Sequence, residues 1–101
     1  FVVQEVPNRN VLPAQKYGEL ILCLPPGDVV LSAAPTVSRL RKKLKAYKDG
    51  DYILTMGDPI AIALAGAIAS DINNGNVQFL KWDRQERVYY PVKANIYGRA
   101  A

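Results

Sequence analysis

Two helical segments, each placed between short apolar runs, constrain the fold of this chain more than any other feature of its sequence. In the first segment, apolar residues recur at spacings of three, four and three, as on one face of a helix. These residues are Val37, Leu40, Leu44 and Tyr47. Thr36 is the predicted N-cap, and the helix is expected to end near Lys48, where Asp49 and Gly50 favour a left-handed stop.

The second helical segment has almost no polar face. It is predicted to run from Pro59 to Ile72, with Asp58 as its N-cap and Pro59 at its first position, where a missing N–H costs nothing. Its residues are mainly alanine and isoleucine, and no charge precedes Asp71. A chain of 101 residues has little material to cover such a helix all round. We therefore expect a homo-oligomer with the helix 59–72 at or near the interface.

Short apolar runs rich in β-branched residues account for the predicted strands. They are Phe1–Val6, Glu19–Leu24, Asp51–Met56, Val77–Trp82 and Arg87–Ile96, with a further short extended piece at Asp28–Ser32. Glu19–Leu24 is apolar almost throughout, which suits a strand covered on both faces. Asn8–Lys16 is polar, contains Pro13 and is predicted to be a loop. The last two strands are expected to form a hairpin around the turn Asp83–Glu86.

The order β-β-α-β-α-β-β predicts an α/β fold. Strands joined through helices are expected to be parallel, with right-handed crossovers, and the C-terminal hairpin adds an antiparallel edge. The chain is 50% hydrophobic with a net charge of +4, values that argue against disorder. Because no linker divides the sequence, residues 1–101 are expected to form one small α/β domain.

Composition excludes much of the chemistry that enzymes use. The chain contains no His, which removes the commonest general base and metal ligand. Cys23 is the one cysteine, so no disulfide or thiolate cluster forms, and its apolar surroundings predict a core residue. Most aspartates fall at predicted caps and turns, where they bond to the local backbone. We expect neither catalysis nor a metal or other cofactor.

Positive charge is concentrated on the first helix and the residues just after it. Six of the 13 Lys and Arg residues lie within ten positions: Arg39, Arg41, Lys42, Lys43, Lys45 and Lys48. At about 100° per residue, Arg39, Lys42 and Lys45 point away from the apolar stripe. No acidic residue interrupts the run, which is typical of a surface that binds phosphates. The partner would be a nucleic acid, or else an acidic protein; the alternative is a solvated face that only maintains solubility.

The turn at Gly57 and Asp58 is a second candidate site. A glycine between a strand and a helix is a place where α/β proteins bind anions at the helix N-terminus. This turn lacks the glycine-rich phosphate motifs, and Pro59 removes one N–H donor. A capped helix is therefore the favoured interpretation, and a nucleotide or small-anion site is the alternative.

The predicted hairpin is the third candidate site, because aromatic and basic residues gather there. Such a surface stacks bases or anchors a protein partner. Its members are Trp82, Arg84, Arg87, Tyr89 and Lys93. In the alternative, Trp82 packs in the core beside Leu80, while Asp83 and Glu86 pair with the two arginines. Strand alternation places Val88, Tyr90, Val92, Ala94 and Ile96 together on the opposite face.

Several stretches of the chain resemble a group of short proteins from tailed bacteriophages. They are Val2–Pro7, Leu24–Gly27, Asp51–Pro59 with the alanine-rich helix that follows, and Leu80–Val92. The resemblance implies a phage genome and action in the cytoplasm of the infected bacterial host, and it carries no catalytic residue. The longest uncharged apolar stretch, Pro59–Ser70, falls short of the roughly 20 residues that span a bilayer, so no membrane partner is expected. The sequence thus predicts a small phage accessory protein that acts by binding.

Overall fold

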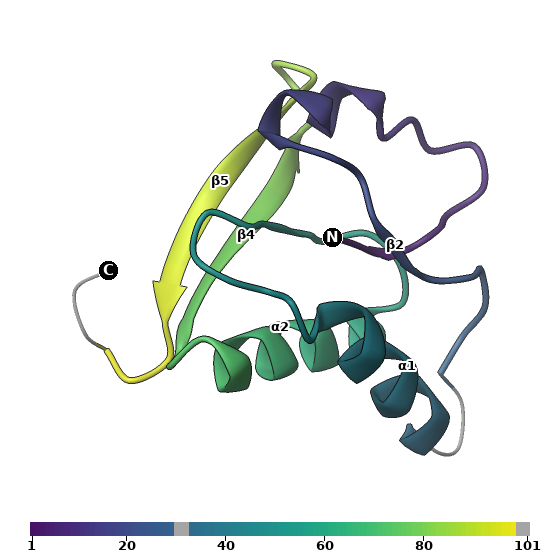
Figure 1. The fold of residues 1–101 in the computed structure, drawn as a ribbon. Coiled ribbons are helices and arrows are strands. Elements are labelled where there is room, and N and C mark those ends of the chain that lie inside the picture. The colour runs from purple at the N-terminus through teal and green to yellow at the C-terminus, as the bar shows by residue number, and fades with distance from the viewer. Residues whose placement is uncertain (30–32, 99–101) are drawn as a thin grey trace.

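Five short strands form one mixed sheet through the middle of the molecule, in the order β2-β1-β3-β4-β5 (Figure 1). The structure, a computed structural model, describes residues 1–29 and 33–98. The strands are β1 Val2–Gln4, β2 Leu22–Leu24, β3 Ile53–Leu54, β4 Asn76–Asp83 and β5 Val88–Asn95. Neighbours are parallel except β4 and β5, which form the predicted antiparallel hairpin. The predicted α/β class is confirmed.

The helices lie on both sides of this sheet. They are the 3-10 helix η1 Leu12–Tyr17 and the α-helices α1 Ala34–Leu44 and α2 Pro59–Ile72. The chain moves one way along the sheet from β1 to β2, then the opposite way from β2 to β3 and on to β4. Right-handed connections therefore place η1 on one face and both α-helices on the other, as Figure 1 shows.

Strand alternation divides the core between these two faces. Val3, Ile53 and Val77 point to the α-helical side, where they pack with Leu40 and Leu44. The alternate residues point to the η1 side and form a second cluster around Val2, Leu54, Leu80 and Tyr89. Because the side-chain period of a strand is two, β1, β3, β4 and β5 each supply both clusters. Cys23 is buried on the α-helical side, as predicted.

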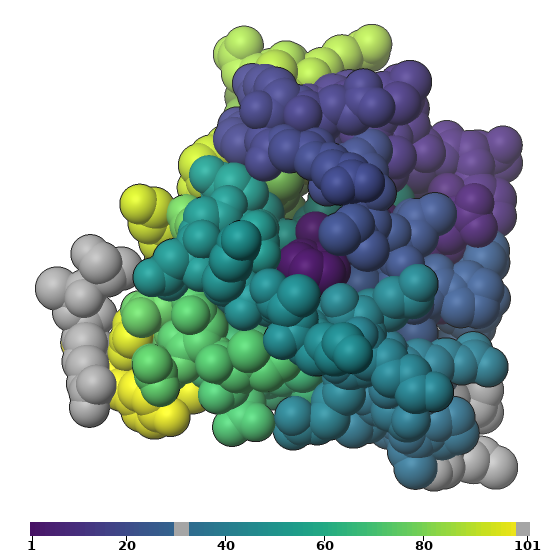
Figure 2. Space-filling model, viewed as in Figure 1, coloured from purple at the N-terminus to yellow at the C-terminus, as the bar shows by residue number. Residues whose placement is uncertain are grey.

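The surface view shows how the first strand is enclosed. In Figure 2 the start of the chain lies at the bottom of a hollow between η1 and the segment that follows α1. The hollow is lined by Tyr17, Leu20 and Tyr52 among others, with a volume of about 300 Å³. The Tyr17 and Tyr52 rings meet edge to face with their centroids 5.3 Å apart. Apolar and aromatic side chains therefore close the η1 side over the amino end of β1.

The structure corrects the predicted helix boundaries. Helix α1 begins at Ala34, and its N-cap is Ala33 rather than Thr36; Pro35 sits in the first turn, where no N–H is needed. The helix ends at Leu44 instead of near Lys48, although Gly50 does adopt the left-handed conformation, with φ 93°. The predicted loop Asn8–Lys16 contains most of η1, which begins with Pro13 in its first turn. For α2, both the boundaries and the Asp58 cap are confirmed.

Four of the strands are shorter than the apolar runs that predicted them, whereas β4 extends one residue beyond its predicted run at each end. The run Glu19–Leu24 was expected to be covered on both faces, but β2 is an edge strand and its Leu22 is 47% exposed. Its apolar residues are divided instead, because Leu20 packs on the η1 side and Cys23 on the α-helical side. Asp28 and Val29 form no strand, and residues 30–32 of the expected extended piece lie outside the described residues.

Candidate functional site

Helix α1 presents its charges to solvent because its apolar stripe is fixed in the core. Leu40 and Leu44 are fully buried and Tyr47 is 5% exposed, which sets the rotation of the helix. The basic side chains of this segment are all exposed on the opposite side, as the sequence predicted. We call this surface the basic face: Arg39, Arg41, Lys42, Lys43, Lys45 and Lys48. In Figure 2 it lies at the lower right of the molecule.

One member of the basic face is paired. The Arg41 guanidinium lies 3.4 Å from the Asp71 carboxylate of α2, and both side chains remain largely exposed. Within residues 1–29 and 33–98 this is the only ion pair, so the other five cations of the basic face have no acidic partner. An exposed pair of this kind stabilises the fold by at most about 1 kcal/mol. The basic face therefore keeps a strong positive potential.

At the turn before α2, the protein itself occupies the predicted anion position. One Asp58 carboxylate oxygen accepts from Ile60 N at 2.7 Å, and the other accepts from Val29 N at 3.2 Å. Gly57 has φ 119°, and a side chain there would overlap Gln4. The amino end of α2 is thus capped by a carboxylate, which disfavours an external anion at this point. The fold alone accounts for a glycine at position 57 and an aspartate at position 58.

A cavity of about 560 Å³ opens beside this turn, at the carboxyl ends of β1, β3 and β4 and on the η1 side of the sheet. We call it the carboxyl-end cavity. Its wall is built from the loop after β1, the residues around Met56 and the β4–β5 hairpin. The polar and aromatic members of that wall are Asn8, Arg9, Asn10, Thr55, Trp82, Arg87 and Tyr89, and Gly57 also lines it. Residues from two separate predicted sites therefore line one cavity: Gly57 from the turn, and Trp82 and Arg87 from the hairpin.

The predicted aromatic and basic surface on the hairpin is divided by the structure. Trp82 and Tyr89 are paired across β4 and β5 with ring centroids 4.9 Å apart. Tyr89 is buried and Trp82 is half-buried against the η1-side core, so the interpretation that Trp82 packs beside Leu80 is favoured. Arg84 is exposed in the turn, while Lys93 lies toward the other end of β5. One continuous surface of all five residues does not form.

The charges of the hairpin turn do not pair as expected. Asp83 accepts hydrogen bonds from Gln85 N at 2.9 Å and Glu86 N at 3.2 Å, so it caps the turn instead of binding an arginine. Arg87 consequently extends toward the carboxyl-end cavity without an acidic partner among the described residues.

Arg9 is the charged lining residue that the sequence analysis missed. It follows Asn8, whose φ of 67° turns the chain back over the ends of the strands. The available signal was Pro7-Asn8, a pair that favours a turn just after a strand.

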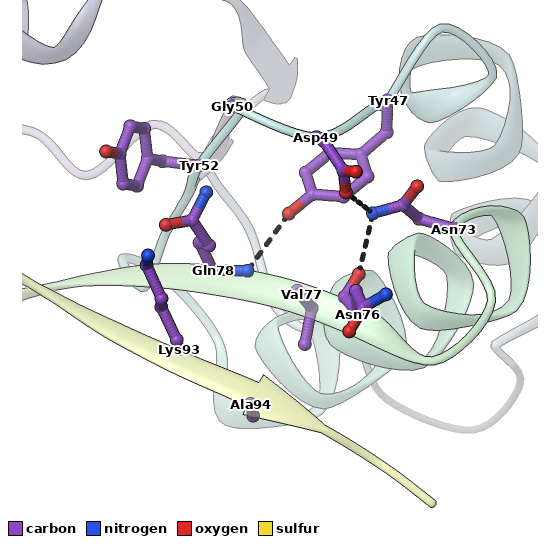
Figure 3. Close-up of a pocket in the computed structure, with 10 residues that line it drawn as sticks. All are labelled: Tyr47, Asp49, Gly50, Tyr52, Asn73, Asn76, Val77, Gln78, Lys93 and Ala94. Atoms are coloured by element: carbon purple, nitrogen blue, oxygen red, sulfur yellow. Dashed lines mark hydrogen bonds between the residues drawn. The ribbon is translucent and has the colours of Figure 1, made fainter. Parts of the chain in front are cut away.

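A second polar pocket, of about 490 Å³, lies at the amino ends of the central strands (Figure 3). Its polar groups bond mainly to each other. The Tyr47 hydroxyl donates to Asp51 O and accepts from Gln78 N, while Asn73 Nδ2 donates to Asp49 Oδ1 and to Asn76 O. Burial raises the pKa of Tyr47, so the hydroxyl stays protonated in this role. These bonds tie the end of α1 to β4, which is a structural function.

The part of the chain that the structure describes holds neither a candidate membrane span nor a candidate metal site. None of the helices within the described residues has the length and apolar character needed to cross a bilayer. Within the same residues, no three His, Cys, Asp or Glu side chains gather as a potential metal site.

Comparison with protein families identifies the relatives of the chain. The family model of the Phage Pam3 gp32-like protein matches residues 1–96, which is nearly the whole chain. The chain belongs to the Pam3 gp32-like family. The predicted relationship to short phage proteins is thereby confirmed. No curated protein and no solved structure matches this Pam3 gp32-like chain.

Proposed function

We propose that this phage protein acts by binding rather than by catalysis, and that its basic face binds the phosphate backbone of a nucleic acid. The observation that carries the proposal is the set of five exposed cations on and just after α1 that have no acidic partner among the described residues. Lys and Arg side chains in such a row neutralise successive phosphates and release condensed counterions. The proposed place of action is the cytoplasm of the infected host.

The composition of the helix determines what kind of binding to expect. The exposed side of α1 has neither Asn nor Gln, the residues that commonly read adenine edges. Contacts to phosphates position a protein but do not specify sequence. We therefore expect weak sequence preference and a strong dependence on salt. Three phosphate contacts would reduce affinity roughly 40-fold between about 50 and 200 mM salt.

Charge reversal on the basic face tests this proposal. Arg39→Glu, Lys42→Glu and Lys45→Glu are combined, and binding to labelled duplex DNA and to single-stranded RNA is measured by fluorescence polarisation at low and physiological salt. The matched control reverses three exposed cations elsewhere: Lys16, Lys81 and Arg84. We expect the first variant to lose at least tenfold more affinity than the control. If the wild type shows no salt-dependent binding to either polymer, the nucleic-acid proposal is wrong, and an acidic protein partner becomes the ligand to seek.

The two other binding hypotheses have unequal support. An anion held by the Gly57 turn itself is poorly supported, because Asp58 already caps α2. Association of copies through α2 has support, since Ile60 is 52% exposed and Ala63 and Ala67 of the same helix are also exposed. Apolar helix faces of this kind are commonly covered by a partner. We include a homo-oligomer formed through α2 in the proposed function.

A further inference from the structure

We propose that the carboxyl-end cavity binds a small ligand that joins a planar ring to an anionic group, of the size and chemistry of a nucleoside monophosphate. This site lies on the η1 side of the sheet, whereas the basic face belongs to α1 on the other side. The inference is therefore independent of polymer binding by α1.

The position of the cavity is the first argument. The connection after β1 leads to β2 on one side, whereas the connection after the neighbouring strand β3 leads to β4 on the other side. The strand order therefore reverses between β1 and β3. In open α/β sheets, ligands bind outside the carboxyl ends of the strands at such a reversal. The volume of about 560 Å³ falls within the range of ligand pockets.

Two arginines supply the anion-binding end. Arg9 comes from the loop after β1 and Arg87 from the end of the hairpin turn, and no acidic residue lines the cavity with them. Among the described residues neither guanidinium has an ion pair or a hydrogen bond. Guanidinium groups bind phosphate and carboxylate through paired N–H donors. Two such groups at one cavity, both unpaired, provide charge that the fold itself does not use.

The Tyr89 hydroxyl is a polar group that also lacks a partner. The residue is only 5% exposed and lines the cavity, yet its hydroxyl makes no hydrogen bond within the described residues. Every fully enclosed side-chain oxygen or nitrogen among the described residues has a hydrogen-bond partner. Because the Tyr89 hydroxyl has none there, its oxygen is not fully enclosed in the core. Burial raises the pKa of Tyr89 and the nearby Arg9 charge only partly opposes this, so the hydroxyl is a donor at neutral pH.

The backbone at Arg87 is consistent with a functional constraint on the side chain. Arg87 has φ 55° at the last position of the hairpin turn, where glycine or asparagine is usual. A residue other than glycine is strained in this conformation. The sequence keeps an arginine at this position, and that arginine faces the cavity.

Trp82 supplies the surface for the ring. Its indole is half-buried, is held edge to face against Tyr89, and lines the cavity together with Met56. Stacking on an aromatic side chain stabilises a bound base and tolerates different bases. The pocket in Figure 3 is also lined by aromatic residues, Tyr47 and Tyr52, but the Tyr47 hydroxyl and the Asn73 amide there are bonded to other protein groups. The carboxyl-end cavity combines an indole surface with two arginines that have no acidic partner among the described residues.

The fluorescence of Trp82 provides a direct assay, because it is the single tryptophan of the chain. The four ribonucleoside 5′-monophosphates are titrated into the intact protein, with adenosine and inorganic phosphate as separate probes, and the melting temperature is measured in parallel. We expect at least one monophosphate to change the fluorescence saturably and to raise the melting temperature. Adenosine and inorganic phosphate are expected to bind at least tenfold more weakly than the monophosphate.

Three variants locate the site. Arg9→Ala and Tyr89→Phe each remove a proposed contact, and Arg87→Gly removes the other cation while relieving the left-handed backbone, so it should fold at least as well as the wild type. Each is expected to weaken the monophosphate at least fivefold. Arg84→Ala removes an exposed arginine of the same turn that does not line the cavity, and its affinity should be unchanged.

Three results would overturn the proposal. The first is no fluorescence or melting response to any monophosphate at millimolar concentration. The second is equal affinity for adenosine or for inorganic phosphate, which would remove either the anionic or the ring requirement. The third is undiminished binding by the Arg9→Ala and Arg87→Gly variants, which would place the ligand elsewhere, for example on the basic face.

Discussion

Gln4 is a polar side chain that holds three separate segments together at the end of β1. It is 5% exposed; its Nε2 donates to the carbonyls of Pro25 and Gly27, and its Oε1 accepts from Asp58 N at 2.7 Å. Gln4→Ala would leave these partly buried backbone groups without partners, which costs about 2 kcal/mol. We expect the free energy of unfolding in urea to fall by that amount. Gln85→Ala, at an exposed turn position, is the control and should change it by less than about 0.5 kcal/mol.

Buried titratable groups give the stability of the fold a defined dependence on pH. Burial raises the pKa of Cys23, Tyr47 and Tyr89, so the folded state retains these protons more strongly than the unfolded state. Their contribution is complete at neutral pH and is lost as the pH rises beyond about 8.5–10, where free Cys and Tyr ionise. The urea midpoint should therefore decrease from pH 8 to 11, and less steeply in Tyr47→Phe. Equal slopes for the two proteins would contradict this assignment.

At the scale of elements, β5 is an edge strand whose free side is protected. Ile96 N donates to Gly75 O, so the backbone groups of Ile96 point toward the neighbouring strand. Because this orientation alternates along an antiparallel ladder, the backbone groups of Tyr89 and Pro91 point away from β4, toward the free edge. The Tyr17 hydroxyl donates to Tyr89 O, and Pro91 has no N–H to offer. Both features block pairing with another strand.

Restoring the missing donor tests the role of Pro91. Pro91→Thr adds an outward N–H in the middle of the exposed edge, so association of copies through β5 should increase with concentration. Sedimentation velocity measures this. Lys93→Arg is the control, because it changes a side chain of the same strand, keeps its charge and adds no backbone donor. An unchanged sedimentation profile for Pro91→Thr at high concentration would show that the proline does not protect the edge.

The success of sequence-based prediction differed between elements for physical reasons. Helix α2 was predicted to the residue, because Asp58-Pro59 begins it and Asn73 follows its end. The start of α1 was missed, because Ala33 makes no side-chain cap bond that a sequence pattern reveals. For β2, an apolar run indicated a strand but not its neighbours. Whether a strand lies at an edge depends on chain connections across the sheet, and those are not local properties.

At the scale of the whole molecule, the same distinction applies to the candidate sites. The rotation of α1 follows from its own periodicity, so the exposure of the basic face was predictable. The carboxyl-end cavity was not, because it joins Arg9 to Trp82 and Arg87, which are more than 70 positions away in the sequence. Its members appeared separately as a loop and a hairpin surface. Their meeting depends on parallel strands that bring their carboxyl ends to one edge.

At the same scale, the proposed self-association rests on exposed apolar residues of α2 and β5. Ala63 and Ala67 are exposed on α2. On β5, Val88, Tyr90 and Val92 are also exposed. They lie on the same side of the sheet as α2, because they share a strand face with Ala94, which packs toward the α-helices. Soluble monomers rarely leave large apolar surfaces uncovered, and two-fold dimers are the commonest assembly that covers them.

Ala63→Glu tests whether this side of the molecule forms the interface. Because Ala63 is exposed, a glutamate there should leave the protomer folded, while two such charges at a two-fold contact would repel each other. In sedimentation equilibrium at micromolar concentration, the wild type should exceed the 11.1 kDa of one chain and the variant should match it. Ser38→Glu adds the same charge to an exposed position of α1 and should keep the assembly of the wild type. A wild type that sediments at 11.1 kDa would mean that the outer side of α2 faces solvent or a different partner.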